Sequence, residues 1–345
     1  MTLHEKIGQM LLLGWGGDAD ADSRRVTLHA AELVEDLAAG GVILMRRNVG
    51  TPDQLRAMLG EMQALAARRG LPPLFVAVDQ EGGGVARLTP PQFLPSTDAW
   101  EIGLTDDPIQ ARMAARQTGL ELRSVGINWN FAPVLDVNNN PANPVIGRRS
   151  YGDDPQRVAT MGVAAVLGYQ NDAGILACGK HFPGHGDTDV DSHLALPTIL
   201  HSLERLFAVE LVPFRAAIAA GVAAIMTAHI VFPEMDPTLP ATLSLTVLTG
   251  LLRGDLGFEG LIITDCLEMN GVANDWGEPE AAVLAVLAGA DILLCCHTWT
   301  KQCAIRDGLV AAVEQGRIPL SRIDASLARI TGAKDRWLAA PSDRT

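Results

Sequence analysis

The sequence lacks any basic run or basic helix face, and positive charge is scarce. It has 27 Lys and Arg against 40 Asp and Glu, so its formal net charge is −13 at pH 7. Nucleic-acid-binding proteins usually cluster Lys and Arg, so we expect no nucleic-acid partner. An acidic surface of this kind mainly favours solubility. With 48% hydrophobic and 19% charged residues, the chain has ample material for a large core and too little charge for disorder.

The sequence also lacks a Cys-x-x-Cys pair, and its five cysteines are odd in number. Four of the five lie in or beside apolar runs, which predicts reduced, mostly buried thiols and argues against a structural zinc site. The cysteines are Cys178, Cys266, Cys295, Cys296 and Cys303.

Long apolar runs are missing too. No run approaches the roughly 18 apolar residues of a membrane span. The first residues, Met1–Gly14, contain one Lys and only a very short apolar stretch, whereas a signal peptide needs a longer one and a small-residue cleavage site. We therefore expect a soluble, cytoplasmic protein with no membrane partner.

Short apolar runs recur eight times, and most are preceded by Gly, which often closes a helix in the left-handed conformation. The runs are Gln9–Gly14, Gly41–Met45, Leu74–Asp79, Ile127–Pro133, Gly174–His181, Val222–His229, Leu261–Asp265 and Ala290–Cys296. Segments with helical periodicity lie between them. They include Asp53–Arg69, Pro108–Val125, Pro155–Asp172 and Leu203–Ala220.

Strands that are continuously apolar and alternate with helices indicate a buried parallel sheet, and eight repeats favour a closed barrel. The predicted fold class is α/β, a single (β/α)8 TIM-type barrel. No Pro/Ser/Gly-rich linker divides the chain, so we expect one catalytic domain over residues 1–338. Its last helix, about Leu320–Leu338, should close the barrel, and residues 339–345 should form a flexible tail.

Ionisable residues stand where the predicted strands end. In such barrels the active site lies at the C-terminal ends of the strands. For one strand, a polar residue could simply mark where the strand reaches solvent, but the number of such strands favours a functional site. These residues are Asp79, Asp136, Lys180, His181, His229, Asp265 and His297.

The most polar segment, Lys180–His193, could in principle hold a metal. A calcium loop starting at Asp187 would need Gly at its sixth position, which is Ser192, and Glu at its twelfth, which is Thr198. A zinc site would place His181 and His185 on a helix face, but Pro183 and Gly184 stand between them. We therefore predict that this segment holds no metal.

An acid/base interpretation fits this segment better. Asp191 precedes His193 by two residues, and in an extended loop both side chains leave on the same side. The carboxylate could then orient the imidazole and raise its pKa, which makes the ring a proton donor near neutrality. The alternative is a turn that only holds the shape of the loop.

Two further segments suggest a site. The apolar run Gly260–Asp265 ends in a carboxylate that could be a nucleophile or orient a ligand; spacing alone leaves both open. Asp79–Arg87 combines an acidic strand end with three glycines that allow close backbone approach, followed by Arg87. It contains no dinucleotide-binding GxGxxG. The irregular connection around Arg148–Tyr151 is more typical of ligand contact than of core.

Together these motifs resemble the single-domain family 3 glycoside hydrolases, specifically the bacterial β-N-acetylglucosaminidases (β-hexosaminidases) of cell-wall recycling. The resemblance spans about Lys6 to about Gly332, and its most specific part is Lys180–Thr188 with Asp191-Ser-His193. Supporting motifs are Asp79-Gln-Glu-Gly-Gly, Ala132-Pro-Val-Leu-Asp-Val137, Met226-Thr-Ala-His229, Pro240-Ala-Thr-Leu-Ser244 and Ile263-Thr-Asp-Cys-Leu-Glu-Met269.

The resemblance implies that Asp265 is the nucleophile, which forms a covalent glycosyl-enzyme, and that His193, partnered by Asp191, is the general acid/base. It implies sugar binding by five further residues and no metal or cofactor. Those residues are Asp79, Arg87, Arg149, Lys180 and His181. The expected activity is retaining hydrolysis of terminal β-linked N-acetylglucosamine from muropeptides or chito-oligosaccharides, by a monomer.

Two departures and two alternatives accompany this prediction. Gly84 replaces an arginine often found after the paired glycines, and Cys266 stands where Asp or Ala is common. An imidazole base repels anions less than a carboxylate does, so phosphate could compete with water and make the protein a β-N-acetylglucosaminide phosphorylase. The other alternative is a sugar-binding barrel without turnover. A two-domain β-glucosidase or β-xylosidase of the same family would need a second domain, for which this chain has no room.

Overall fold

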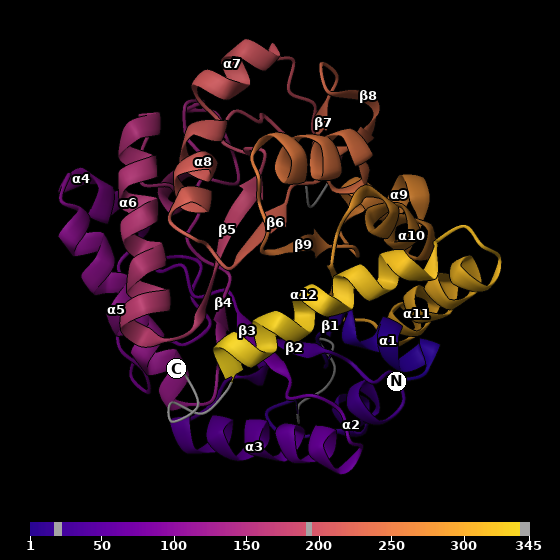
Figure 1. Cartoon of the computed structure of the whole chain (residues 1–345). Helices are drawn as coiled ribbons and strands as arrows, with labels where there is room; N and C mark the ends of the chain where they lie inside the picture. Colours follow the sequence, from indigo (N-terminus) through magenta and orange to yellow (C-terminus); the bar gives the residue numbers. More distant parts are fainter. Residues whose placement is uncertain (17–22, 191–194, 339–345) are drawn as a thin grey trace.

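The computed structural model describes residues 1–16, 23–190 and 195–338. Its centre is a closed barrel in which every neighbouring pair of strands is parallel, and helices surround it (Figure 1). The order around the barrel is β1 (Leu11–Leu13), β10 (Ile292–Cys295), β9 (Leu261–Cys266), β6 (Ala224–Thr227), β5 (Leu176–Phe182), β4 (Trp129–Asn130), β3 (Phe75–Val78) and β2 (Gly41–Leu44). The predicted α/β barrel is confirmed.

Each of the eight predicted apolar runs overlaps one barrel strand, with β5 and β9 ending one residue beyond the predicted run, and nearly every strand residue is buried. Strands of a parallel barrel pack against the barrel interior on one face and against helices on the other, so they need apolar residues on both faces. Asp265 is the partly exposed exception in β9. The barrel therefore opens to solvent where β9 ends.

Three of the long helices begin at a Thr-Pro or Asp-Pro step. α3 (Pro52–Arg68), α5 (Pro108–Ser124) and α6 (Pro155–Leu167) each have Pro in the first turn, where its missing N–H costs nothing. The preceding Thr or Asp side chain accepts a backbone N–H of that turn; for example, Asp154 Oδ1 accepts from Arg157 N at 2.8 Å. These caps fix where each helix begins.

The helix predicted over Leu203–Ala220 is wrong as one element. The structure has α7 (Leu203–Ala208) and α8 (Leu211–Ala219), separated at Val209 and Glu210. Pro213 explains the break, because inside a continuous helix its ring would clash with the carbonyl of Val209 and its missing N–H would lose a hydrogen bond. The helix predicted over Pro155–Asp172 is also divided: α6 ends at Leu167, and the π-helical turn η3 (Gly168–Ala173) follows it directly.

The glycines before the strands behave as predicted in two clear cases. Gly174 (φ 72°) and Gly221 (φ 76°) take the left-handed conformation that ends a helix. The glycines before β2 do not take this conformation, because Ala38 has the positive φ of 52° instead. Gly40 is required for close approach instead, since a Cβ there would lie 2.0 Å from the Gln9 carbonyl oxygen.

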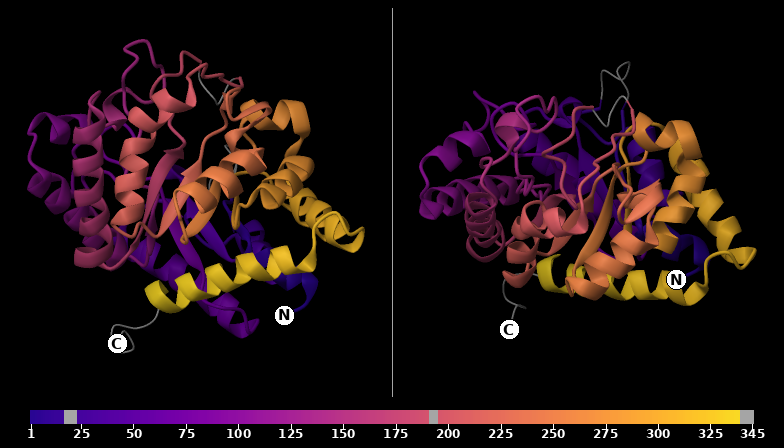
Figure 2. Two further views of the ribbon diagram at one scale, coloured as in Figure 1. Left: turned by 45° about the horizontal axis from the view of Figure 1, so that its top comes forward. Right: turned by 90° about the horizontal axis from the view of Figure 1, so that it is seen from above.

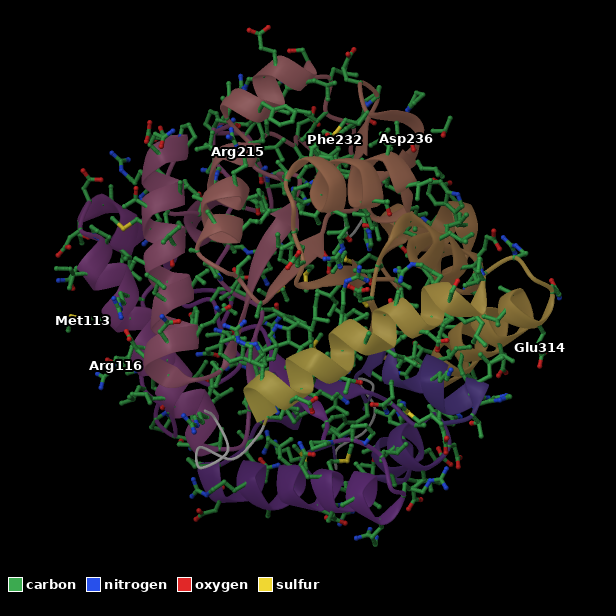
Figure 3. The ribbon with its side chains drawn as sticks, viewed as in Figure 1. Met113, Arg116, Arg215, Phe232, Asp236 and Glu314 are labelled. Atoms are coloured by element: carbon green, nitrogen blue, oxygen red, sulfur yellow. The ribbon has the colours of Figure 1, made fainter. Side chains whose placement is uncertain are left out.

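Further helices complete the outer layer, and a small hairpin lies outside the barrel. The helices are α1 (Leu3–Gln9), α2 (Leu28–Glu35), α4 (Ala99–Leu104), α9 (Asn270–Trp276), α10 (Glu278–Ala288), α11 (Trp299–Glu314) and the π-helical η5 (Thr246–Asp255). The hairpin pairs β7 (Val231–Phe232) with β8 (Asp236–Pro240), and Figure 3 labels Phe232 and Asp236 within it. Among the described residues, no helix combines the length and the apolar character that crossing a membrane requires.

Helix α12 (Leu320–Leu338) closes the N-terminal end of the barrel, as predicted (Figures 1 and 2). Lys334 Nζ donates to Gln9 Oε1 at 2.8 Å, just before β1, and lies 5.2 Å from the ring centroid of Phe75, the first residue of β3. Arg322 Nη2 donates to the carbonyl of Ala290, just before β10, at 2.7 Å. The predicted tail, residues 339–345, lies outside the described residues.

Lys334 should make the stability depend on pH. Only 4% of it is exposed, and burial lowers its pKa from 10.5 to about 7. The unfolded chain therefore holds a proton that the folded chain releases between pH 7 and pH 10.5, so stability should rise with pH over that window. We expect Lys334→Met to increase the free energy of unfolding at pH 6 by on the order of 2–4 kcal/mol, less the lost bond to Gln9.

Urea unfolding of both proteins at pH 6 and pH 9 measures this effect. The gain in free energy of unfolding from Lys334→Met should be smaller at pH 9, because the buried lysine destabilises the wild type less at that pH. An advantage that is equal at both pH values, or a destabilised variant at pH 6, would contradict the assignment.

Candidate active site

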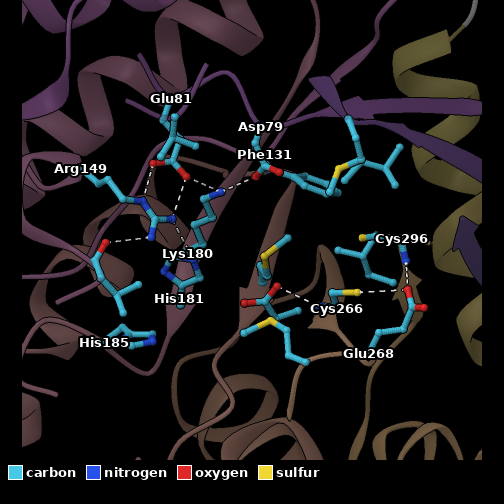
Figure 4. Close-up of a pocket in the computed structure, with 18 of the residues that line it drawn as sticks. Asp79, Glu81, Phe131, Arg149, Lys180, His181, His185, Cys266, Glu268 and Cys296 are labelled. Atoms are coloured by element: carbon cyan, nitrogen blue, oxygen red, sulfur yellow. Dashed lines mark hydrogen bonds and ion pairs between the residues drawn. The ribbon is translucent and has the colours of Figure 1, made fainter. Parts of the chain in front are cut away.

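A cavity of about 430 Å³ opens at the C-terminal ends of the barrel strands (Figure 4). Each strand brings its last residues to this end, so residues distant in the chain share one wall. The ionisable residues that line it are Asp79, Glu81, Arg87, Arg149, Lys180, His181, His185, Asp265, Cys266, Glu268, Cys296 and His297. Six of the residues predicted to form the site, Asp79, Arg87, Arg149, Lys180, His181 and Asp265, therefore lie together.

One side of the cavity is an ionic cluster centred on Lys180, whose side chain is only 2% exposed. Its Nζ lies 2.7 Å from Asp79 Oδ1 and 2.7 Å from Glu81 Oε1. Arg149 binds Glu81 in a bidentate pair, with Nε–Oε2 and Nη2–Oε1 distances of 2.8 Å (Figure 4). Arg87 Nη2 reaches Asp79 Oδ2 at 3.4 Å. The cluster joins three cations to two carboxylates and carries a net positive charge.

The charges in this cluster stabilise one another. Burial alone would raise the pKa of Glu81, but the charges of Arg149 and Lys180 hold it well below its usual range. Burial would lower the pKa of Lys180, yet Asp79 and Glu81 keep it above the ordinary lysine value. Both groups are therefore ionised at neutral pH, and they present fixed charges to a ligand that enters the cavity.

His181 is held from behind by Asp136, which is completely buried. The Asp136 Oδ2 atom lies 2.8 Å from His181 Nδ1. Asp136 Oδ1 also accepts the backbone N–H of His181 at 3.1 Å and of His185 at 2.8 Å. Burial would raise the pKa of Asp136, but the His181 interactions lower it overall. Asp136 is thus a strand-end residue that supports the wall and does not line the cavity.

Asp265 lies at the end of β9 and is partly exposed to the cavity. Burial raises its pKa, but the His229 and His181 imidazoles and the Cys266 backbone N–H, 2.7 Å from Oδ1, lower it overall. The carboxylate is therefore ionised at neutral pH. His229 lies behind this wall, with Nε2 3.0 Å from the Cys266 carbonyl oxygen and Nδ1 2.8 Å from Thr242 Oγ1.

The opposite side of the cavity is built around Glu268. Its Oε2 accepts the backbone N–H groups of Cys296 and His297, each at 2.7 Å, and its Oε1 accepts that of Thr298 at 3.0 Å. These bonds tie the loop after β9 to the start of α11. Burial would raise the pKa of Glu268, and the Thr298 and His297 contacts lower it overall.

The predicted buried thiols are confirmed, because all five cysteines are free and four of them are buried. Cys266 and Cys296 line the cavity. The Cys266 Sγ lies 3.8 Å from Glu268 Oε2, within hydrogen-bonding range for sulfur. Within the described residues, no group of three His, Cys, Asp or Glu side chains is arranged to hold a metal ion.

Sequence reasoning missed the roles of Glu81 and Glu268. Glu81 had a usable signal, because residues 79 and 81 follow the same strand and alternate side chains leave on one face. Glu268 had none, since its partners are backbone groups of residues 296–298. Asp191 and His193 lie outside the described residues, so their predicted role stays a prediction. On either side of them, Asp187 Oδ2 and His201 Nε2 lie 2.5 Å apart.

Comparison with protein families gives one match over almost the whole chain. The family model described as the glycosyl hydrolase family 3 N terminal domain matches residues 2–333. A beta-hexosaminidase from Thiobacillus denitrificans is 41% identical over 81% of this chain and 75% of its own length. Beta-hexosaminidase A from Pseudoalteromonas piscicida is 35% identical over 97% of this chain, which spans 61% of that protein.

Solved structures give the same picture. A glycoside hydrolase family 3 beta-N-acetylglucosaminidase from Paenibacillus superposes with a TM-score of 0.94 at 46% identity, covering 100% of this chain and 66% of that one. A beta-N-acetylhexosaminidase from Beutenbergia cavernae superposes with a TM-score of 0.88 at 30% identity, covering 97% and 98% of the two chains. The chain thus spans about two thirds of the first structure and nearly all of the second.

Proposed function

Because the chain belongs to glycosyl hydrolase family 3, we propose that it is a retaining exo-glycosidase that hydrolyses terminal β-linked N-acetylglucosamine. The observation that supports this best is one cavity that joins the ionised carboxylate of Asp265 to the ionic cluster around Lys180. Fixed charges of both signs suit a ligand rich in hydroxyl groups. The names of the relatives supply the sugar, and we carry it over to this chain with muropeptides or chito-oligosaccharides as the substrate class.

In the first step of the proposed mechanism, Asp265 attacks the anomeric carbon on the face opposite the leaving group. The bond to the leaving oxygen breaks, and His193 gives that oxygen its proton. A covalent glycosyl-aspartate forms, and the His193 ring becomes neutral. Attack by the carboxylate requires it to be ionised, which the lowered pKa of Asp265 supports.

In the second step, a water molecule attacks the same carbon and transfers its proton to His193. The bond between the sugar and Asp265 breaks, which restores the free carboxylate and the protonated imidazole. Two displacements at one carbon give the β-anomer, so the configuration is retained. A retaining glycosidase ordinarily uses two carboxyl groups about 5–5.5 Å apart; here the Asp191–His193 pair takes the place of the second.

The anomer of the first product tests the function. An aryl β-N-acetylglucosaminide is followed by proton NMR with and without inorganic phosphate, and the β-anomer of the free sugar should appear first in both. The α-anomer would contradict retention, and a sugar 1-phosphate would make the protein a phosphorylase. Absence of any turnover would favour the sugar-binding alternative.

His193→Ala should slow substrates according to their leaving group. An alkyl glycoside needs protonation of its leaving oxygen, so we expect a loss of about 10²-fold in kcat/KM. A dinitrophenyl glycoside leaves as a stable anion and should lose much less. His4→Ala, an exposed histidine in α1, serves as the control and should change neither rate. An equal loss for both leaving groups would contradict the acid role.

A further inference from the structure

We propose that Asp136 is a positioning residue that holds His181 as the neutral tautomer with its proton on Nδ1, so that the Nε2 lone pair faces the cavity. This inference deepens the proposed function, because it assigns His181 a hydrogen-bond role at the sugar site. Two contacts, one at each nitrogen of the His181 ring, support it.

The first contact is the Asp136 carboxylate at Nδ1. Asp136 is 0% exposed, and its Oδ2 lies 2.8 Å from His181 Nδ1. Its Oδ1 already accepts two backbone N–H groups, as expected of a carboxylate that only accepts, so Nδ1 must carry the hydrogen. The same side chain accepts the N–H groups of His181 and His185, and the Asp136 carbonyl accepts Ser150 Oγ at 2.6 Å. Because these bonds anchor Asp136, it can fix the ring orientation.

The second contact is the Arg149 guanidinium at Nε2. Arg149 Nη2 lies 3.3 Å from His181 Nε2 (Figure 4). A guanidinium only donates, so Nε2 must accept and cannot carry a hydrogen in this arrangement. A doubly protonated ring would turn an N–H toward the arginine and place two positive charges together. The two contacts therefore select one neutral tautomer.

The groups around the ring support this assignment. Burial lowers the pKa of His185 to about 4, so this neighbouring ring, 5.6 Å away between centroids, is neutral at physiological pH. The other charged groups of this wall are Arg149 and Arg87, which only donate, and Lys180, which lies 2.7 Å from both Asp79 and Glu81; the Asp265 carboxylate lines the same cavity. The lone pair of His181 Nε2 is then an acceptor beside cations that can only donate. We infer that a sugar hydroxyl donates its hydrogen to Nε2 while Arg149 donates to the oxygen of the same or a neighbouring hydroxyl.

Asp136→Asn tests the proposal with little change of shape. The asparagine Oδ1 can still accept the two backbone N–H groups, but an amide NH2 now faces Nδ1 and donates to it. The proton of His181 should then move to Nε2, where it opposes Arg149 and removes the acceptor. We expect kcat/KM to fall about 10- to 100-fold, mainly through a higher KM, because a binding contact is lost in the ground state as well.

The decisive measurement is the tautomer itself, read from two-bond proton–nitrogen NMR correlations of the ring, with the signal assigned by its loss in His181→Gln. The wild type should show hydrogen on Nδ1, and Asp136→Asn should show it on Nε2. Asp291→Asn is a matched control, because Asp291 is also 0% exposed but lies at the other end of the barrel, bonded to Arg253 and Ser326. It should lower stability and leave both the tautomer and KM unchanged.

A wild-type ring with hydrogen on Nε2, or on both nitrogens between pH 6 and 8, would overturn the proposal, even if Asp136→Asn failed to fold. So would an Asp136→Asn protein with an unchanged tautomer and unchanged KM, or an Asp291→Asn protein that behaves like Asp136→Asn. The NMR result does not depend on turnover. Failure of the proposed function would therefore appear separately, as inactivity of a wild type that has the expected tautomer.

Discussion

Asp265→Asn should reduce kcat on an aryl β-N-acetylglucosaminide by about 10³- to 10⁵-fold while the fold is kept. The amide cannot form the ester bond to the anomeric carbon, and it also removes the negative charge that would stabilise the positive sugar in the transition state. Asp255→Asn, an exposed aspartate at the end of η5, is the matched control and should keep the wild-type rate. A near-normal kcat in Asp265→Asn, with an unchanged melting temperature, would rule out this nucleophile.

The shorter variant Asp265→Ala gives a second test of the same role. It leaves space on the face from which the carboxylate attacks, and azide can enter from that side. An activated dinitrophenyl glycoside should then yield the α-glycosyl azide, as its carbon–oxygen bond breaks and a carbon–nitrogen bond forms on the opposite face. A β-glycosyl azide would mean that attack comes from the other side of the sugar.

Lys180→Met should lower the free energy of unfolding by about 3–5 kcal/mol, because removing one partner leaves buried carboxylates without their main counterion. In the wild type, Lys180 lies 2.7 Å from both Asp79 and Glu81. In the variant, Glu81 would still pair with Arg149, but Asp79 would retain only the longer contact to Arg87. Lys6→Met removes the exposed pair with Asp324 and should cost no more than about 1 kcal/mol. Urea unfolding at pH 7 measures both.

The loss of stability in Lys180→Met should depend on pH. The pKa of Glu81 is lowered in the folded protein, so its ionised form adds stability above the usual value of 4.5, and that stability is lost as the pH falls below it. Lys180→Met removes part of this contribution. The difference between the two proteins should therefore shrink at acid pH; a difference that stays constant would mean that the loss comes from packing alone.

The fold could be predicted from the sequence because a parallel barrel needs strands that are apolar on both faces. Six barrel strands fall within predicted runs, β5 and β9 each extend one residue beyond theirs, and α12 has the predicted bounds. The hairpin of β7 and β8 could not be found in this way, because β8, Asp236–Pro240, has only one buried residue and contains two prolines. The break between α7 and α8 depends on Pro213, which periodicity alone does not register.

The site was predictable to the extent that it lies at strand ends. Asp79, Lys180 and Asp265 end three different strands, and barrel geometry brings them to one cavity. The sequence could not show which strand-end residues turn away from it. Asp136 and His229 stand in the same pattern, yet both are buried behind the wall and support other residues. Such contacts arise only when separate strands meet.

The position of α12 has a practical consequence for how the protein can be handled. Helix α1 and helix α12 both lie at the N-terminal end of the barrel, where Lys6 pairs with Asp324, whereas the cavity opens at the other end. A bead or surface coupled through α1 or α12 would therefore hold the molecule with this cavity turned outward. An insoluble polymer could then reach the immobilised protein without meeting the attachment point.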